Sequence, residues 1–193
     1  SKSKVEIISL LRSLNAKGKT VVVVTHEQEV AAYCRRVVTM RDGEIISENR
    51  NGVERDYGPD PQGNVIALYD SGQNKTDTWT YWPYGEVKTR TGTTATPFQY
   101  IGTRGYYQDS STKTYVRARY LDVQKGRWMT QDPIGYEAGR WNLYDYVDKN
   151  PATYLDPSGL VPILPIACAA ACLGCFWCIG HYCDCGITDL ACW

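Results

Sequence analysis

The spacing of hydrophobic residues is helical near the start of the chain and typical of β-strands further along it. Apolar residues between 7 and 14 recur at helical spacing, which predicts a helix that ends within residues 15–18. Residues 20–24 form a continuous β-branched run, typical of a strand covered on both faces of a parallel sheet. Later runs at 65–70 and 76–82 are separated by turn residues, and in the second run alternation places aromatic rings on one face. The pattern predicts an α+β fold, in which a small α/β portion precedes a mainly antiparallel β meander.

Turn signals subdivide this pattern. An Asp-Gly pair at 42–43 between two apolar runs predicts a β-hairpin over residues 37–46. Residues 48–58 are polar and contain Asn-Gly and Gly-Pro pairs, which predicts a boundary between domains. The predicted organisation is therefore 1–50, 57–160 and a tail over 161–193.

Residues 115–160 contain two Asp-Pro-x-Gly elements, 132–135 and 156–159. An aspartate that bonds its own backbone, followed by a proline that fixes φ, is a common way to open a turn. Turn formation alone would account for Asp132 and Asp156. If the fold instead brings the two carboxyls together, they cannot both ionise, so one can act as a base and the other as an acid.

The order R-A-R-Y, G-R-W, D-P-x-G, N-L-Y-x-Y, N-P, D-P-x-G-L over 115–160 resembles the core segment that ends the shell of rearrangement-hotspot (RHS) repeat proteins. Residues 57–114 are more loosely similar to the YD-repeat units of such shells. The resemblance implies a strip of a β shell. It also implies an aspartyl self-cleavage site, with Asp132 and Asp156 as catalytic carboxylates and Leu160–Val161 as the scissile bond.

Two features bear on the geometry of that site. Residues 137–141 make the spacing between the two Asp-Pro elements longer than in the family pattern. Arg117, Arg119 and Arg127 are available to orient the two aspartates or to hold other carboxylates such as Asp122, although exposed ion pairs are the commoner role of such residues.

The run GKTVVVVTHEQEVAAYCRRVVTMRDGEIISE resembles the end of an ATP-binding-cassette (ABC) ATPase of the lipoprotein- or macrolide-exporter type. In that family a histidine at the position of His26 contacts the γ-phosphate, whereas taken alone a histidine here is more typical of a residue at a strand end. The chain contains no glycine-rich loop with Lys-Ser/Thr to hold phosphates. His26 is therefore interpreted as vestigial, and ATP hydrolysis is not expected.

The tail is apolar and rich in cysteine. Residues 161–182 contain no Asp, Glu, Lys or Arg, and a bilayer span takes roughly 17–25 residues. All cysteines except Cys34 lie in 168–192. The spacing of Cys172, Cys175 and Cys178 matches part of an iron–sulfur loop but has no correctly spaced fourth ligand, so no metal is assigned. A membrane segment, a disulfide-bonded peptide and a metal site are the alternatives for the tail. In the RHS family the chain after the D-P-x-G-L element is a variable effector.

Charge and composition limit the partners. The formal net charge is +0, which gives no electrostatic argument for nucleic acid. No cofactor is expected. The RHS resemblance implies further shell strands or an immunity protein for the tail as partners, and a bacterial secreted or cell-surface location, although residues 1–4 show no signal-peptide pattern. The predicted function is a β scaffold with self-cleavage after Leu160. The alternatives are an inert structural or binding module and a nucleotide-binding ABC fragment without hydrolysis.

Overall fold

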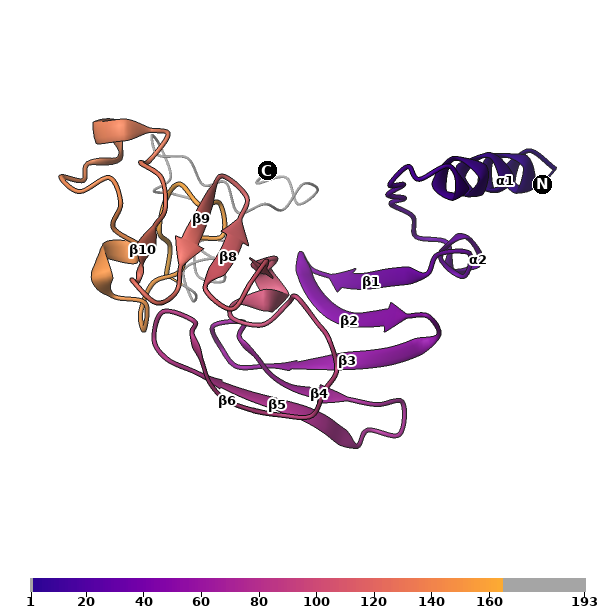
Figure 1. Ribbon diagram of the computed structural model, residues 1–193, viewed down its shortest axis with the longest axis horizontal. Helices are drawn as coiled ribbons and strands as arrows, with labels where there is room; N and C mark the ends of the chain where they lie inside the picture. Colours follow the sequence, from indigo (N-terminus) through magenta and orange to yellow (C-terminus); the bar gives the residue numbers. More distant parts are fainter. Residues whose placement is uncertain (1, 165–193) are drawn as a thin grey trace, which may run out of the picture.

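The computed structural model describes residues 2–164, apart from the side chains of residues 2–4 and 138. Within this range the chain is mostly antiparallel β structure, with two α-helices near its start and three short 3-10 helices (Figure 1). The elements in chain order are α1 (Lys2–Ala16), α2 (Gln28–Ala31), β1 (Arg36–Arg41), β2 (Glu44–Arg50), β3 (Val53–Pro59), β4 (Val65–Tyr69), β5 (Lys75–Tyr81), β6 (Val87–Thr91), η1 (Gly102–Arg104), β7 (Tyr107–Gln108), β8 (Lys113–Val116), β9 (Arg119–Asp122), β10 (Arg127–Trp128), η2 (Gly135–Ala138) and η3 (Val147–Lys149).

The larger sheet is a six-stranded meander in the order β1-β2-β3-β4-β5-β6. Its first two hairpins turn at Asp42-Gly43 and Asn51-Gly52, where all four residues have positive φ. Two consecutive positive φ values define the hairpin turn whose twist matches that of the flanking strands. The predicted hairpin over 37–46 is confirmed. The polar stretch 48–58, in contrast, makes no break in the sheet, because β2 pairs with β3 across the Asn-Gly turn.

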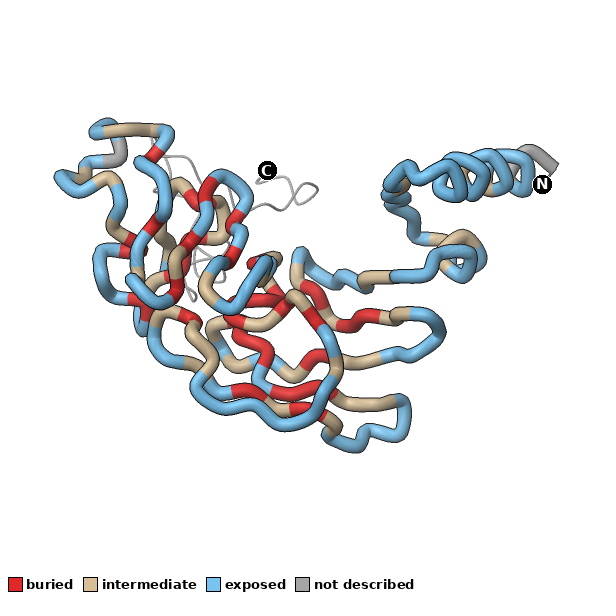
Figure 2. The backbone as a smooth tube through the Cα atoms, viewed as in Figure 1, coloured by how far each residue is buried: buried red, intermediate tan, exposed pale blue. Residues whose placement is uncertain are grey.

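The smaller sheet has the order β10-β9-β8-β7. Two clusters of buried side chains support the two sheets, and buried residues gather along both (Figure 2). The cluster on the larger sheet is formed by Ile45, Tyr57, Val65, Leu68, Trp79 and Phe98. The cluster beside the smaller sheet is formed by Tyr100, Ile101, Tyr106, Val116, Leu121, Val123, Trp128, Tyr146, Val147 and Leu155. Tyr81 packs against both clusters, which joins them.

The first part of the chain differs from the prediction. The helix predicted over residues 7–14 is confirmed within α1, but residues 20–24 form no strand. Val22 and Val24 are 84% and 97% exposed. A strand of a parallel sheet must be covered on both faces, and this run has no neighbouring strands here, so the prediction of a parallel α/β portion is wrong. Helices α1 and α2 lie at the opposite end of the molecule from β9 and β10 (Figure 1).

The predicted tail lies almost entirely outside the described residues, which end at Leu164. The cysteine cluster and most of the apolar segment 161–182 therefore belong to the part that is not described. Of the helices in the described part, none has the length and apolar character needed to cross a bilayer.

A buried carboxylate ties the larger sheet to the loop that follows it. Glu48, 5% exposed, accepts hydrogen bonds on Oε1 from Arg36 Nε (2.6 Å) and Arg50 Nη2 (2.7 Å). Its Oε2 accepts one from the Tyr57 hydroxyl (2.8 Å), which also bonds the Thr96 hydroxyl (2.8 Å). Burial alone would raise the pKa of Glu48, but the hydrogen bonds from Arg50, Tyr57 and Arg36 together with the Arg36 charge outweigh burial and lower it.

We expect Glu48→Gln to lower the free energy of unfolding by about 2 kcal/mol at pH 7, since hydrogen bonds to a charged group are lost. Because the folded-state pKa is lowered, the contribution of Glu48 is present above the ordinary value of 4.5 and is lost as the pH falls through the lowered value. Urea unfolding at several pH values measures this. Glu54→Gln, at an exposed position on β3, is the control, and an equal effect of both variants at pH 7 would contradict the prediction.

Candidate active site at two Asp-Pro turns

The first Asp-Pro element is a turn closed by its own aspartate. Asp132 Oδ1 accepts a hydrogen bond from the backbone N–H of Ile134 (3.0 Å), and the Asp132 carbonyl accepts one from the N–H of Gly135 (2.9 Å). The N–H of Asp132 donates to the carbonyl of Leu143 (3.0 Å), which fixes the turn against a later loop. The predicted turn-forming role of Asp132 is therefore confirmed by the geometry.

The second element is closed more tightly. Asp156 Oδ1 accepts hydrogen bonds from the Ser158 hydroxyl (2.9 Å) and from the backbone N–H groups of Leu160 and Val161 (both 3.1 Å). The backbone of Asp156 is held from the other side by the Tyr106 hydroxyl, which donates to its carbonyl (2.8 Å) and accepts from its N–H (3.1 Å). The Asp156 carboxylate thus lies directly beside the amide nitrogen of the predicted scissile bond.

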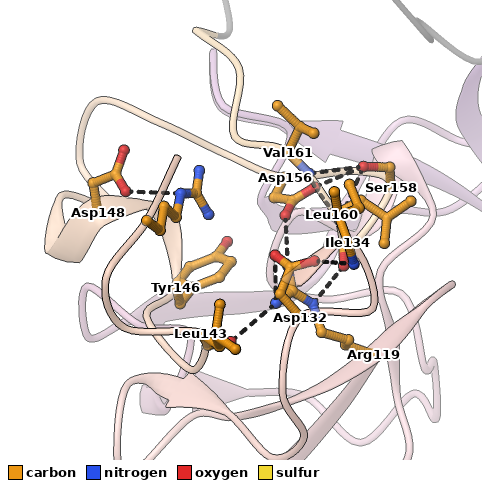
Figure 3. Close-up of polar contacts among 12 residues, drawn as sticks. Arg119, Asp132, Ile134, Leu143, Tyr146, Asp148, Asp156, Ser158, Leu160 and Val161 are labelled. Carbon is orange, nitrogen blue, oxygen red and sulfur yellow. Dashed lines mark hydrogen bonds and ion pairs between the residues drawn. The ribbon is translucent and has the colours of Figure 1, made fainter. Parts of the chain in front are cut away.

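Arg119 on β9 brings the two aspartates together (Figure 3). Its Nη1 lies 3.0 Å from Asp132 Oδ2, and its Nη2 lies 3.5 Å from Asp156 Oδ2. All three side chains are 1% exposed. Both Oδ2 atoms and Nη2 are buried without a hydrogen bond of good geometry, so charge attraction links Arg119 to Asp156 rather than a directed hydrogen bond.

The rest of the Arg119 side chain is also held. Its Nε donates to the carbonyl of Gly159, which lies in the second Asp-Pro element, and its guanidinium lies over the ring of Trp128 with 4.3 Å to the ring centroid. A guanidinium stays protonated in proteins and its planar fork can serve two acceptors at once. Arg119 therefore connects the two turns through their side chains and through the backbone.

The charges of this site do not balance. One guanidinium faces two carboxyls, so a negative charge would remain buried unless one carboxyl carries a proton. Burial raises the pKa of Asp156, and the hydrogen bonds from Ser158 and Leu160 together with the Arg119 charge oppose this rise without cancelling it. Burial thus shifts Asp156 toward its protonated form.

The predicted scissile bond lies in a short closed loop. Leu155 and Ile163 exchange two backbone hydrogen bonds, of 3.0 and 2.7 Å, across an isolated bridge. The loop between them contains the Asp-Pro turn, Leu160 and Val161. Leu160 is half-buried and Val161 is 43% exposed, so the bond lies at the boundary between the buried carboxyls and solvent.

Most of the other residues singled out in the sequence lie away from the two aspartates or contact other groups. Of the three arginines, only Arg119 contacts both aspartates; Arg117 donates to the carbonyl of Pro157, and Arg127 has no ion pair among the described residues. Asp122 pairs with Lys125 (3.0 Å) rather than with an arginine. His26 is exposed, in the irregular segment directly before α2, and α2 lies at the opposite end of the molecule from β9, which carries Arg119 (Figure 1).

The extra residues 137–141 do not separate the two aspartates. Residues 137 and 138 end η2, and residues 139–141 belong to the loop that follows it. This part of the chain faces solvent: Tyr136 in η2 is 72% exposed and Trp141 in the loop is 96% exposed. Sequence reasoning missed two residues of the site, Ser158 and Tyr106. Ser158 occupies the variable position of Asp-Pro-x-Gly, and only its hydroxyl group could have pointed to a role. Tyr106 lies fifty residues from Asp156 along the chain, and nothing in the sequence indicated that the two residues meet. In residues 2–164 no group of His, Cys, Asp and Glu side chains is arranged to hold a metal ion.

The described fold is similar to parts of solved toxin structures. The crystal structure of TcdB2-TccC3-Cdc42 superposes with a TM-score of 0.57 and 24% identity, over 65% of this chain and 6% of that chain. TcdB2-TccC3 without its hypervariable C-terminal region gives a TM-score of 0.52 and 29% identity, over 57% of this chain and 5% of that chain. The Tc holotoxin pore of Photorhabdus luminescens gives a TM-score of 0.56 and 23% identity, over 66% of this chain and 6% of that chain.

Sequence comparison shows a second similarity, to curated macrolide exporters. The macrolide export ATP-binding/permease protein MacB of Chlorobium luteolum is 50% identical over 68 residues, 35% of this chain and 10% of that protein. MacB of Burkholderia pseudomallei is 43% identical over 67 residues, 34% of this chain and 10% of that protein. No protein-family model matches the chain. The chain thus has partial sequence similarity to an ABC exporter and a fold similar to a Tc-toxin component, and it spans about a tenth of the curated relatives it matches.

Proposed function

We propose that this chain is a toxin-type RHS scaffold that cleaves itself between Leu160 and Val161 and so releases the segment that begins at Val161. The observation that carries the proposal is the 3.1 Å contact between Asp156 Oδ1 and the amide nitrogen of Val161, in a site that also holds Asp132. The similarity to TcdB2-TccC3 supports the scaffold part of the proposal.

In the proposed reaction, Asp132 is the base and Asp156 the acid. Asp132, whose charge is balanced by Arg119 at 3.0 Å, takes a proton from water while the water oxygen forms a bond to the carbonyl carbon of Leu160. Once water has added to the Leu160 carbonyl, the Val161 nitrogen is no longer conjugated and can accept a proton. Asp156, whose raised pKa favours the protonated form, then gives its proton to this nitrogen as the carbon–nitrogen bond breaks. The products are a carboxyl group on Leu160 and a free amine on Val161, so atoms and charge balance.

The burial of the site sets the expected rate. Both carboxyl side chains are 1% exposed, so we expect a water molecule to reach Asp132 only when the loop closed by Leu155 and Ile163 opens. Cleavage within one chain avoids the entropy cost of bringing a substrate to the site. We therefore expect a slow reaction that depends on loop opening and not on protein concentration.

Intact-mass spectrometry of the purified chain, followed over time, tests the proposal. Wild type should yield two fragments that meet at Leu160–Val161, with a rate that is unchanged on dilution. Asp132→Asn and Asp156→Asn should each abolish the cut, because an amide neither takes nor gives the required proton. Asp148→Asn is the matched control, since Asp148 is an exposed aspartate of the same region and should leave cleavage unchanged.

Breaks at Asp132–Pro133 or Asp156–Pro157 would be acid hydrolysis of Asp-Pro bonds and would count against the proposal, as would cleavage that persists in both variants. A chain that stays intact would support the second candidate, an inert structural module. That candidate is favoured by the fact that each aspartate already closes its own turn and that Arg119 joins the two turns.

We further propose that residues 1–50 derive from an ABC exporter ATPase and are joined to the scaffold without ATPase activity. Support comes from the partial similarity to MacB. Residues 20–24, the counterpart of a buried ATPase strand, are largely exposed here, and His26 has no phosphate-holding loop beside it. Saturable ATP binding, measured by titration, would contradict this part of the proposal.

A further inference from the structure

A hollow lined by arginines lies at the edge of the larger sheet, apart from the aspartate site. It has a volume of about 610 Å³, and its lining includes Arg35, Arg36, Arg50, Arg90, Thr96 and Gln108. Arg35 and Arg36 are neighbours at the start of β1, Arg50 ends β2, Arg90 lies in β6, Thr96 lies in the loop after β6 and Gln108 lies in β7. Four arginines from three strands or strand ends thus line one space.

The acidic groups around this hollow do not balance its positive charge. Glu48 forms ion pairs with Arg36 and Arg50, and the charge of Arg90 lowers the pKa of the buried Asp77. Four positive charges against these two carboxylates leave two in excess. In the described part of the chain, Arg35 and Arg90 form no ion pair. The hollow is therefore electropositive, and it contains guanidinium N–H donors that no carboxylate uses.

Three of the four arginines, Arg36, Arg50 and Arg90, are held in place by side-chain contacts. Glu48 Oε1 fixes both Arg36 and Arg50, because it accepts hydrogen bonds from Arg36 Nε (2.6 Å) and from Arg50 Nη2 (2.7 Å). The Arg90 guanidinium lies over the Trp79 ring, 5.2 Å from its centroid, and its Nη2 donates to the carbonyl of Thr94 (2.6 Å). Each guanidinium has five N–H donors, so most donors remain available. Held guanidinium forks are the usual means of binding phosphate-type oxyanions.

One further atom defines what the ligand must offer. Gln108 Oε1 is buried, lies on a lining residue and has no hydrogen-bond partner. Because this oxygen is buried, a ligand in the hollow meets it only when the Gln108 side chain turns toward the hollow, and a ligand that carries a hydroxyl or a protonated oxygen would then satisfy it. Hydrogen phosphate and phosphomonoesters with a neighbouring hydroxyl combine negative charge with such a donor, whereas sulfate has the charge and shape but no proton.

From these observations we infer that the arginine hollow is a binding site for a phosphate group, either free phosphate or a small phosphomonoester.

Calorimetric titration of the full chain at low ionic strength tests this, with inorganic phosphate, glycerol 3-phosphate and sulfate as separate probes. Phosphate or glycerol 3-phosphate should bind saturably, and sulfate more weakly. Arg35→Gln and Arg90→Gln should each weaken binding about tenfold, which corresponds to the loss of one charged hydrogen bond. Both positions are exposed and stand outside the Glu48 ion pairs. Arg35→Gln should unfold at the wild-type temperature, whereas Arg90→Gln also loses the contacts with Trp79 and Thr94 and should unfold at a lower temperature while remaining folded at the temperature of the titration.

Gln108→Leu should remove the preference for phosphate over sulfate. Arg12→Gln, an exposed arginine on α1, is the matched control and should bind as wild type does. Whichever of free phosphate and glycerol 3-phosphate binds more tightly identifies the source of the group. The inference fails if neither probe binds saturably, or if Arg12→Gln weakens binding as much as Arg35→Gln and Arg90→Gln.

Discussion

Replacing Arg119 by methionine is expected to lower the free energy of unfolding by about 3–5 kcal/mol at pH 7, the usual cost of removing one partner from a buried ion pair. Methionine keeps much of the side-chain volume beside Trp128 but removes the charge from between Asp132 and Asp156. Two carboxyls would then be buried without a cation, and the Gly159 carbonyl would lose its donor. Urea or guanidinium unfolding, monitored by tryptophan fluorescence, measures the loss.

This destabilisation should shrink as the pH falls. The Arg119 charge lowers the pKa of Asp156, which burial has already raised, so removal of the charge raises it further. A folded-state pKa above the unfolded value means that the folded chain gains stability as the pH falls through it. The difference in unfolding free energy between Arg119→Met and wild type should therefore be smaller at pH 4 than at pH 7.

Two further variants identify the cause. Arg127→Met, at an exposed position on β10, should change stability by less than about 0.5 kcal/mol. Adding Asp132→Asn and Asp156→Asn to Arg119→Met should recover part of the loss, because neutral amides cost less to bury than charged carboxylates. If Arg119→Met behaves like Arg127→Met, the buried cation does not hold the two turns together.

Gly159→Ala is expected to destabilise the chain by about 2–4 kcal/mol, because a new methyl group must enter a closely packed space in a strained backbone conformation. Gly159 has φ +72°, and a Cβ there would lie 2.3 Å from the carbonyl oxygen of Val116 and 3.2 Å from the N–H nitrogen of Arg119. Both neighbours are backbone atoms, so no side chain can rotate away. The variant should also slow the proposed cleavage, which intact-mass spectrometry would detect.

The first Asp-Pro element supplies the matched control. Gly135 occupies the same position in its turn as Gly159 and has a similar φ of +68°, but a Cβ there would meet nothing within 4 Å. Gly135→Ala should therefore carry only the conformational cost, about 1 kcal/mol. Equal losses of stability in the two variants would show that the close approach of β8 and β9 to Gly159 is unimportant.

Local structure was largely readable from the sequence. Hairpin turns at Asp42-Gly43 and the strands around 65–70 and 76–82 follow from residue types that act over a few positions, and the structure forms them. The same signals misled where context decides. Asn51-Gly52 indicated a domain boundary but is a hairpin turn within one sheet, and the valine run at 20–24 read as a buried strand although the described chain provides no neighbouring strands to cover it.

The candidate site divides in the same way. The sequence by itself determined that Asp132 and Asp156 open two turns, since an aspartate before proline bonds its own backbone whatever the rest of the chain does. Only the tertiary structure decided that both carboxyls meet at Arg119, that Tyr106 holds Asp156 from behind, and that Asp156 lies against the Val161 nitrogen. The contacts made by Arg119 and Tyr106 join residues that are 13 to 50 positions apart in the chain, as in the pairs Arg119–Asp132 and Tyr106–Asp156. Packing of the smaller sheet brings such pairs together, and turn propensity carries no information about it.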